Sequence, residues 1–487
     1  MAVEAASDSS RPESVAAKLG RLDNSTVFFF SVTGLPGAAL GLMLGTYMPK
    51  YFTGHLHMDL VVWAATLAFV RLIDIPFDPA IAMVMDRVST PWGRYKVWMV
   101  LGLPLLMGGT YLMFNAPVGV TTQYLITALL VLYAGTSIFN LAHAAWAANL
   151  ATGYNERSRV YGWMQAVAVL GSVGLSAAPI LTHGLVNPAA THSVPMIGTG
   201  ILIAFPVTMA IVFFLAPERV LKAQASKGGN VFAKAGKFFG DAGKALGNPS
   251  MLRIIVADLC LVLGPGTTSP IYAFFFRDAK GFTPTDVSLL LIPYIGAGLF
   301  GAPFWAMIAR WLGKHRTLQV GVVCYAIAQT TLMALPKALF VPTAIGMFCV
   351  GFCAACFVIM IRAMVADIAD EVKLDQGKEQ ISLLYSMIGI TGKIGGSLTS
   401  IIIFPILAWV GFQAADEAKN TPDAIFGLEM CYLFAPIIFT LIGGTLMFGY
   451  KLDAKKHGEI REALDARAAA EDAQAGLPAN QGTREPI

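Results

Sequence analysis

The chain has 487 residues, of which 56% are hydrophobic and only 13% are charged, and its formal net charge is +4. Soluble domains carry about 25% charged residues, so this composition excludes a water-soluble globule. The basic residues are scattered and many lie at the edges of apolar segments rather than on one continuous surface, so we expect no nucleic-acid partner.

Apolar segments of about 20 residues recur along the whole chain, which is the length a helix needs to cross a hydrocarbon core of about 30 Å. Residues 1–24 are polar and lack the apolar core and cleavage site of a signal peptide, so we expect a cytoplasmic N-terminal segment there. We predict an all-α integral membrane protein with twelve spans, at 27–48, 60–85, 97–116, 123–148, 160–183, 195–216, 252–276, 287–309, 317–336, 340–364, 381–410 and 427–450.

The second predicted span contains ionisable residues in an apolar setting. Asp74 and Asp78 are four residues apart, so they share one helix face. If Asp86 marks the inner end, Asp78 lies about 12 Å and Asp74 about 18 Å into the bilayer, at 1.5 Å per residue. A charge at that depth costs at least about 2.5–3.5 kcal/mol, so such residues face a cavity or one another. We therefore predict a site for a hard cation or a proton, with Arg71 as ion-pair partner; the alternative is a charge network that only holds helices together.

Other polar residues in the spans allow two interpretations each. His143 in the fourth span is either a hydrogen-bonded packing residue or a proton relay or substrate contact. Asp258, Arg362, Asp367 and Asp370 fall near the inner ends of spans seven and ten. They are interpreted as gating salt bridges, with solvation at the membrane interface as the alternative.

No catalytic or metal site is expected. All six cysteines fall in apolar spans, and Cys353 and Cys356 lie in a segment of small residues that favours close helix packing. His55 and His57 are expected to be solvated in an outer loop. No phosphate-binding glycine loop or hydrolytic triad occurs, so we expect neither an enzyme nor a cofactor.

The hydrophilic segment 217–251 divides the spans six and six. We expect it to be a cytoplasmic linker between bundles at 25–216 and 252–450, with a cytoplasmic tail at 451–487. Each half places a glycine and a basic residue in the loop after its second span, at Gly93–Arg94 and Gly313–Lys314. Two similar halves around a central pathway form a recurrent transporter architecture. Most loop Lys and Arg residues fall on the side of the N-terminus, which predicts that both termini are cytoplasmic.

A lysine occurs deep in the eleventh predicted span. Lys393 lies about 20 Å into the bilayer if the span begins near Gln380, and Gly392, Gly395 and Gly396 beside it allow close approach of other helices. We predict a role at the transport pathway, and a structural ion pair is the alternative.

Together these residues resemble a known family. The segment from Arg71 through Asp74, Asp78–Pro79 and Asp86 to Gly93–Arg94 resembles the signature of the glycoside–pentoside–hexuronide:cation symporters of the major facilitator superfamily. The resemblance covers most of the chain in matching order and extends to Glu156, Arg157, Asp367, Asp370, Tyr385, Ser386 and Lys393.

The resemblance implies a major facilitator fold, alternating access and no cofactor besides a transported proton or sodium ion. It implies a cation-binding and coupling set made of Asp74, Asp78, Ser137, Asn140 and Lys393. The substrate-binding positions would be Ala38, Asn140, His143, Gln165, Tyr385 and Lys393. The gating and structural positions are Arg71, Asp86, Gly93, Arg94, Asp367 and Asp370 by this resemblance, together with Arg362, which is assigned from its place near the inner end of the tenth span.

The chain departs from the family pattern at several positions. Phe77 stands where the sodium site of melibiose-type members has an amide, which favours a proton over sodium. Ala38, Asn140 and Gln165 stand where family sugar transporters have two acids and an arginine.

We therefore predict a cation-coupled symporter of a small organic solute, most simply a sugar or glycoside. The alternatives are a transporter of an amphipathic, lysolipid-like solute and, from another class, a membrane sensor without transport. We expect a monomer in a lipid bilayer, as a multi-pass protein of a bacterial inner (plasma) membrane.

Overall fold

The computed structural model describes residues 22–85, 90, 93–150, 154–218, 240, 243, 247–376, 381–415, 418–450, 452 and 454–474. Within these residues twelve helical segments are long and apolar enough to cross a membrane, as the sequence predicted. A helix satisfies its own backbone hydrogen bonds, which a segment surrounded by hydrocarbon must do.

The first six spans form one bundle. The first span is segmented into α2 (Asn24–Ser31), α3 (Gly34–Leu42), the π-helical turn η1 (Met43–Tyr47), α4 (Met48–Lys50) and the π-helical turn η2 (Tyr51–His55). The next spans are α5 (Leu60–Met85), α6 (Lys96–Phe114), α7 (Thr122–Leu150), α8 (Tyr154–Leu181) and α9 (Val194–Leu215), which follows the short turn η3 (Thr191–Ser193).

The last six spans form the second bundle, and a tail helix follows them. The seventh span comprises α11 (Pro249–Thr268), α12 (Tyr272–Phe274) and η4 (Phe275–Ala279), and the eighth comprises α13 (Pro284–Leu289) and α14 (Leu291–Leu312). The others are α15 (Lys314–Ala334), α16 (Phe340–Gln376), α17 (Ile381–Trp409) and α18 (Pro422–Thr445), and the tail helix is α19 (Ala454–Gln474).

Capping residues in the sequence mark the start of several of these helices. The side chain of Asn248 accepts hydrogen bonds from the backbone N–H groups of Ser250 and Met251 at the start of α11. Thr283 and Asp286 form a capping box at the start of α13. These side chains satisfy backbone donors that have no partner within the helix.

Glycines allow the helices of one bundle to pack backbone to backbone. A Cβ atom at Gly109 of α6 would lie 2.3 Å from the Cα of Leu132 in α7, and one at Gly135 of α7 would lie 2.2 Å from the backbone nitrogen of Leu106 in α6. Any larger residue at either glycine would push these two helices apart. Small residues at helix contacts are typical of membrane bundles, where close packing replaces the hydrophobic effect.

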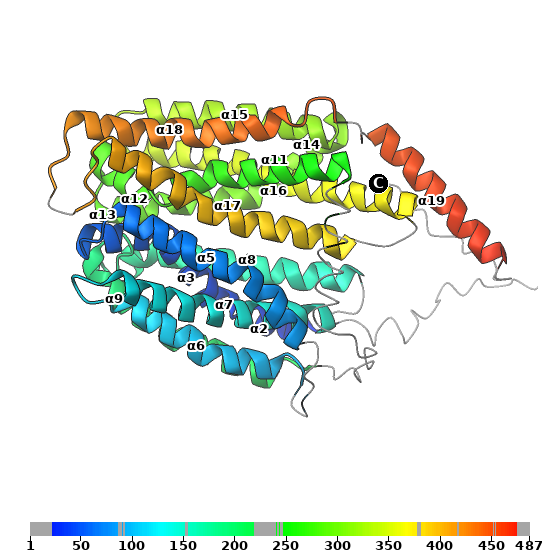
Figure 1. Ribbon diagram of the computed structural model, residues 1–487, viewed down its shortest axis with the longest axis horizontal. Helices are drawn as coiled ribbons and strands as arrows, with labels where there is room; N and C mark the ends of the chain where they lie inside the picture. Colours follow the sequence, from blue (N-terminus) through cyan, green and yellow to red (C-terminus); the bar gives the residue numbers. More distant parts are fainter. Residues whose placement is uncertain are drawn as a thin grey trace, which may run out of the picture.

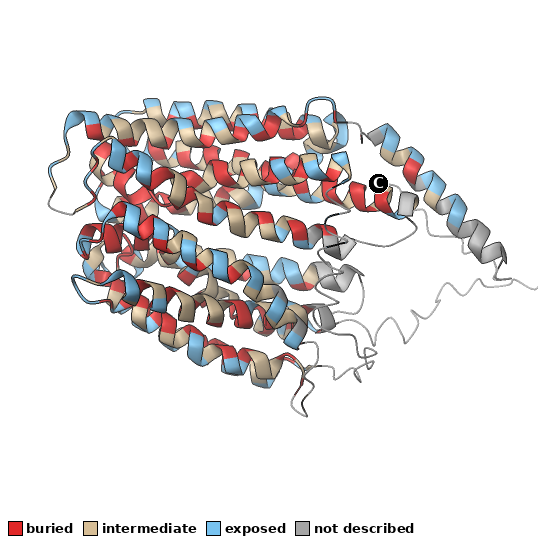
Figure 2. Cartoon of the chain, viewed as in Figure 1, coloured by how far each residue is buried: buried red, intermediate tan, exposed pale blue. Residues whose placement is uncertain are grey.

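The two bundles lie as two layers with their helices nearly parallel (Figure 1). They meet where α5 packs against α17 and where α8 packs against α13 and α14. The end at which α19 lies is called the terminal face here, and the other end the opposite face. Exposed residues run along the outward surfaces of both layers (Figure 2), and many are large and apolar, such as Leu72, Phe214 and Trp409. Such a surface fits a hydrocarbon environment.

Candidate transport site

A cavity of about 730 Å³ lies between the two bundles. Most of its walls are small or hydroxyl-bearing residues, and its four charged residues come from α5 of the first bundle and α17 of the second. Its lining comprises Gly41, Leu44, Gly45, Pro49, Leu67, Arg71, Asp74, Asp78, Tyr133, Thr136, Ser137, Asn140, Leu141, Gly266, Ser269, Pro270, Gly389, Gly392, Lys393, Gly396, Ser397, Thr399 and Ser400.

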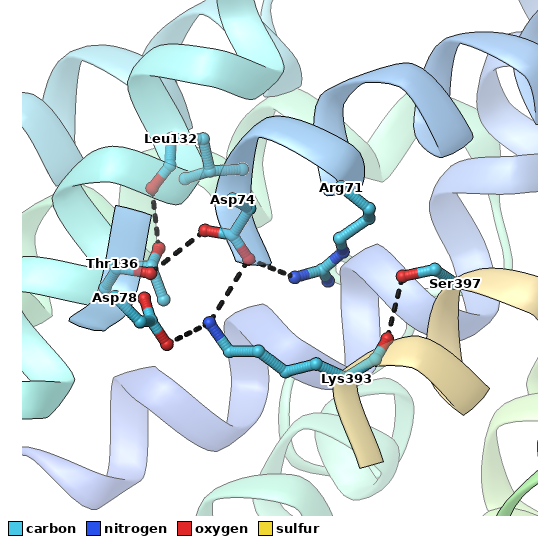
Figure 3. Close-up of polar contacts among 8 residues, drawn as sticks. Arg71, Asp74, Asp78, Leu132, Thr136, Lys393 and Ser397 are labelled. Atoms are coloured by element: carbon cyan, nitrogen blue, oxygen red, sulfur yellow. Dashed lines mark hydrogen bonds and ion pairs between the residues drawn. The ribbon is translucent and has the colours of Figure 1, made fainter. Parts of the chain in front are cut away.

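Asp74 of α5 is the centre of a charged cluster in this cavity (Figure 3). Its Oδ2 accepts hydrogen bonds from Arg71 Nη1 at 3.0 Å and from Lys393 Nζ at 3.2 Å. Its Oδ1 accepts one from the hydroxyl of Ser137 in α7 at 3.1 Å. The side chain of Asp74 is only 3% exposed, so three donors from three helices surround a buried carboxylate.

Asp78 lies one helical turn from Asp74 and shares Lys393 with it. The ammonium of Lys393 donates to Asp78 Oδ2. The other oxygen, Oδ1, is buried and has no hydrogen-bond partner among the described residues. Asp78 therefore keeps one oxygen available for a further donor.

The cluster joins two positive and two negative groups across the bundle interface. Two unit charges about 4 Å apart attract by roughly 4 kcal/mol at an effective dielectric constant of 20. Neutralising one acid removes much of the attraction that holds Lys393 to α5. The charge state of Asp74 and Asp78 therefore controls how firmly the two bundles are joined here.

Arg71 is held on its other side by an aromatic ring. The guanidinium carbon lies 3.8 Å from the ring centroid of Tyr133 in α7. The Arg71 and Lys393 side chains are 27% and 31% exposed, against 3% for Asp74. The cationic side chains of Arg71 and Lys393 are therefore more accessible from the cavity than the carboxylate of Asp74, which they contact.

Uncharged contacts join the bundles toward the opposite face. The hydroxyls of Thr46 in η1 and Ser269, just after α11, are 3.1 Å apart. Asn187, between α8 and η3, donates from Nδ2 to the hydroxyl of Thr285 at 3.3 Å and accepts at Oδ1 from that of Ser288 at 2.8 Å. We call these five residues the opposite-face latch. Sequence reasoning missed it because serine, threonine and asparagine are common in loops.

The family model described as MFS/sugar transport protein matches residues 29–454. The chain belongs to this family. The protein is therefore a major facilitator transporter rather than an enzyme, as the sequence predicted.

Relatives of this transporter cover nearly its whole length at low identity. It is 24% identical to an isoprimeverose transporter of Lactiplantibacillus pentosus, over 96% of this chain and 97% of the relative. It is 22% identical to a glucuronide carrier protein homolog of Escherichia coli, over 86% and 91% respectively. It is 21% identical to the human sodium-dependent lysophosphatidylcholine symporter 1, over 90% and 87%.

Solved structures share the fold. The nucleoside transporter NupG superposes with a TM-score of 0.65 at 12% identity, covering 88% of this chain and 100% of that one. A bacterial homolog of the human lysosomal transporter Spinster, inward-facing and unoccupied, gives 0.62 at 13% identity, covering 90% and 97%.

The remaining predicted site residues of the transporter fall in different places. Ser137 and Asn140 line the cavity, and the Asn140 side chain is exposed. Ala38 and Gln165 do not belong to the cavity lining as the described residues form it. Asp86 lies outside the described residues, and the side chains of Tyr385, Glu156 and Arg157 are likewise not described.

His143 is enclosed within the first bundle. Its Nε2 lies 3.0 Å from the carbonyl of Phe30 and 3.3 Å from the hydroxyl of Thr33, and its ring packs against Phe30 at 4.5 Å between centroids. It is not part of the cavity lining formed by the described residues. These contacts fit the packing interpretation better than substrate binding.

On the terminal face, Gly93 and Arg94 acquire a partner that the sequence did not suggest. Glu218, just after α9, accepts backbone N–H bonds from Arg94 at 2.7 Å, Tyr95 at 2.8 Å and Lys96 at 3.1 Å. A carboxylate at a helix N-terminus is stabilised by the unpaired N–H groups there. Gly93 has φ +124° and a Cβ would lie 2.0 Å from Glu218, so glycine is required.

On the terminal face of the second bundle, contacts between side chains join the helices. Lys314 at the start of α15 donates to both oxygens of Asp367 in α16, at 2.6 and 2.8 Å. His457 of α19 lies 3.0 Å from Asp370 and 3.4 Å from Asp367. Burial raises the pKa of the nearby Tyr450 phenol, and the charge of Asp367 adds to the effect. Asp367 and Asp370, two of the acids predicted to gate the transporter, thus join α15, α16 and the tail helix.

Proposed function

We propose that this transporter carries a sugar or glycoside together with a proton, by alternating access. The observation that carries the proposal is the double ion pair of Lys393 with Asp74 and Asp78, which joins the two bundles inside the cavity. A bound cation neutralises the acids, frees Lys393, and so couples ion binding to the separation of α5 and α17.

The unpartnered oxygen of Asp78 supports the proton over sodium. A hard metal cation needs several oxygen ligands, whereas a proton needs one lone pair. Three of the four carboxylate oxygens in the cluster already accept hydrogen bonds from protein groups, and only Asp78 Oδ1 has no partner among the described residues. Phe77 between the two acids contributes no oxygen.

The cavity walls support a polyhydroxylated solute. Asn140 and Ser400 add hydrogen-bonding groups to a lining that is otherwise mostly small residues. Release of Lys393 would place an ammonium beside the substrate, where it can donate to hydroxyl or carboxylate oxygens. The relatives named for isoprimeverose and glucuronide agree with this class of substrate.

A second cavity favours one alternative, transport of an amphipathic, lysolipid-like solute. It has about 290 Å³, is lined mainly by apolar and aromatic residues including Tyr272, Tyr294 and Tyr432, and shares Gly266 and Ser269 with the main cavity. An acyl chain could occupy such a space. Uptake of a labelled sugar in competition with lysophosphatidylcholine separates the two candidates.

Proteoliposomes with imposed gradients test the coupling. A proton gradient should drive uptake of a sugar in the unmodified protein, and Asp74→Asn and Asp78→Asn should abolish accumulation. Asp59→Asn is a matched control, because Asp59 caps the other end of the same helix through Val61 and Val62. Accumulation that persists in both cavity variants would refute the assignment, and accumulation driven only by sodium would refute the proton.

The transporter is proposed to lie as a monomer in a bacterial inner membrane with both termini in the cytoplasm. The loop Lys and Arg residues support this orientation through the positive-inside rule. Protease cleavage of a C-terminal tag in inside-out but not right-side-out vesicles checks the orientation. Light scattering of the purified protein checks the monomer, and a mass of twice the chain would contradict it.

A further inference from the structure

A buried acid lies outside the transport cavity, between two helices of the second bundle. Asp258 of α11 is 6% exposed and its Oδ2 forms a hydrogen bond with the hydroxyl of Thr391 in α17. Thr391 precedes Lys393 by two residues, so the two side chains point to nearly opposite faces of α17. Asp258 therefore contacts the back of the helix whose front carries the coupling lysine.

The seam between α11 and α17 is tight along its length. A Cβ at Gly395 would lie 2.7 Å from Val262, and a Cβ at Gly266 would lie 2.7 Å from Thr399. These contacts repeat every four residues from the Asp258–Thr391 pair, so one helix face of α11 follows one face of α17. Asp258 sits at one end of this close contact.

The hydrogen bonds of the Thr391 hydroxyl bear on the protonation state of Asp258. Its Oγ1 contacts two oxygens, Oδ2 of Asp258 and the carbonyl of Ile388, the latter at 2.7 Å. A hydroxyl has one hydrogen and a carbonyl can only accept. If Asp258 is ionised, two acceptors compete for that hydrogen. If Asp258 is protonated, it donates to Thr391, and Thr391 donates to Ile388.

The geometry points to Asp258 as a second proton-binding site of the transporter, separate from Asp74 and Asp78. A proton held there joins α11 to the back of α17, one half-turn from Lys393. This proposal does not rest on which ion binds at the cavity acids.

Charged neighbours make the site able to titrate. Asp258 is 6% exposed, and burial of a carboxyl disfavours its charged form. Arg362 of α16 is the charged residue that acts electrostatically on Asp258. On α11 itself the nearest other ionisable groups are Arg253 and Cys260, and on α17 the nearest is Lys393. On α18, which also packs against α11, the part of the helix close to Asp258 is marked by Gly443, which lies against Ala257 and Leu261. The ionisable residues of α18 are eleven or more positions away from Gly443: Asp423, Glu429, Cys431 and Tyr432.

Infrared difference spectroscopy of the purified protein in lipid vesicles tests the proposal directly. The carbonyl stretch of a protonated carboxyl should be present at neutral pH, disappear on a jump to alkaline pH, and be lost in Asp258→Asn. Asn keeps a donor for Thr391, so this variant should fold. A carboxyl spectrum that Asp258→Asn leaves unchanged at every pH would overturn the proposal.

A second pair of variants tests the contact itself. Thr391→Val removes the acceptor and should shift the Asp258 band to higher frequency. Thr343→Val is the matched control, because the hydroxyl of buried Thr343 in α16 also donates to a backbone carbonyl of the preceding turn, that of Leu339, at 2.7 Å. Equal spectra for the two valine variants would overturn the proposal even if Asp258→Asn failed to fold.

Discussion

Two of the polar contacts between the bundles differ in chemistry. In the cavity, Lys393 of one bundle forms ion pairs with Asp74 and Asp78 of the other. At the opposite-face latch, hydroxyl and amide groups form neutral hydrogen bonds, each worth about 0.5–1.5 kcal/mol. Under the proposed mechanism, thermal motion breaks the latch, whereas the ion pairs separate readily only after an acid is neutralised. An alternating-access carrier needs both kinds of contact: one that opens without a ligand and one that opens only when a ligand is bound.

The largest expected effect comes from removing the shared cation. Lys393→Met leaves Asp78 without its described partner, so gradient-driven uptake should fall roughly tenfold or more, given that 1.4 kcal/mol corresponds to a factor of ten. Lys393→Arg keeps the charge and should retain more activity than the methionine variant. Initial rates of uptake in proteoliposomes measure the difference. Equal accumulation by Lys393→Met and the unmodified protein would show that the charged contact is not the switch.

A smaller effect is expected at the hydroxyl that supports Asp74. Ser137→Ala removes one donor to a carboxylate, a bond worth about 1.5–3 kcal/mol, so proton binding should strengthen. The pH at which uptake falls should move upward by about one unit. Thr136→Val is the control, since its hydroxyl bonds only to the carbonyl of Leu132 in the described structure. A profile shifted equally by both variants would contradict the role of Ser137.

Substitutions in the opposite-face latch should have a smaller effect, which we expect in the relative populations of the two conformational states. Asn187→Ala removes two side-chain bonds between the bundles, so the state open at the opposite face should gain about fivefold in population, corresponding to about 1 kcal/mol. Spin labels at the exposed positions Leu185 and Lys419, in a cysteine-free background, report the distance. Asn420→Ala is the control, because Asn420 bonds only within its own loop, to Gln413, in the described structure. An unchanged distance distribution in Asn187→Ala would exclude the latch.

The smallest effect is expected at Thr46. Thr46→Val removes one neutral bond, and Ser269 can still donate to the carbonyl of Gly45, so the population should change only about twofold. Thr53→Val serves as control, since its hydroxyl bonds within the same span to Pro49. A change larger than that of Asn187→Ala would reverse the proposed order of the two contacts.

Sequence reasoning located the charged contact but not the neutral one. Asp74, Asp78 and Lys393 are conspicuous because charges are expensive in apolar spans, and helix rise alone predicted that they reach similar depths. Asn187 and Ser288 have no such signal, because polar residues near helix ends need no special explanation. Their pairing depends on how the two bundles dock.

The spans themselves were predicted well, apart from their ends. The tenth was expected at 340–364, but α16 continues to Gln376, because a helix does not stop where its apolar stretch stops. Ala38 and Gln165 were assigned to the substrate by resemblance, yet the cavity is lined by Gly41 and Gly45 of the first span instead. Ala38 lies three residues before Gly41 and seven before Gly45, so it shares nearly one helix face with them; the resemblance gave the right face of this span but not the residues that reach the cavity.

The carboxylate of Glu218 has a consequence for how the chain can be divided. It is the last described residue before most of the linker, and it holds the start of α6 through three backbone hydrogen bonds. The first bundle thus ends with a residue that fastens its own helices together. If the gene were divided into two fragments after codon 218, Glu218 would stay in the same fragment as the helix start that it binds. A division a few codons earlier would place Glu218 in the fragment that encodes the second bundle, and these hydrogen bonds would no longer lie within one fragment.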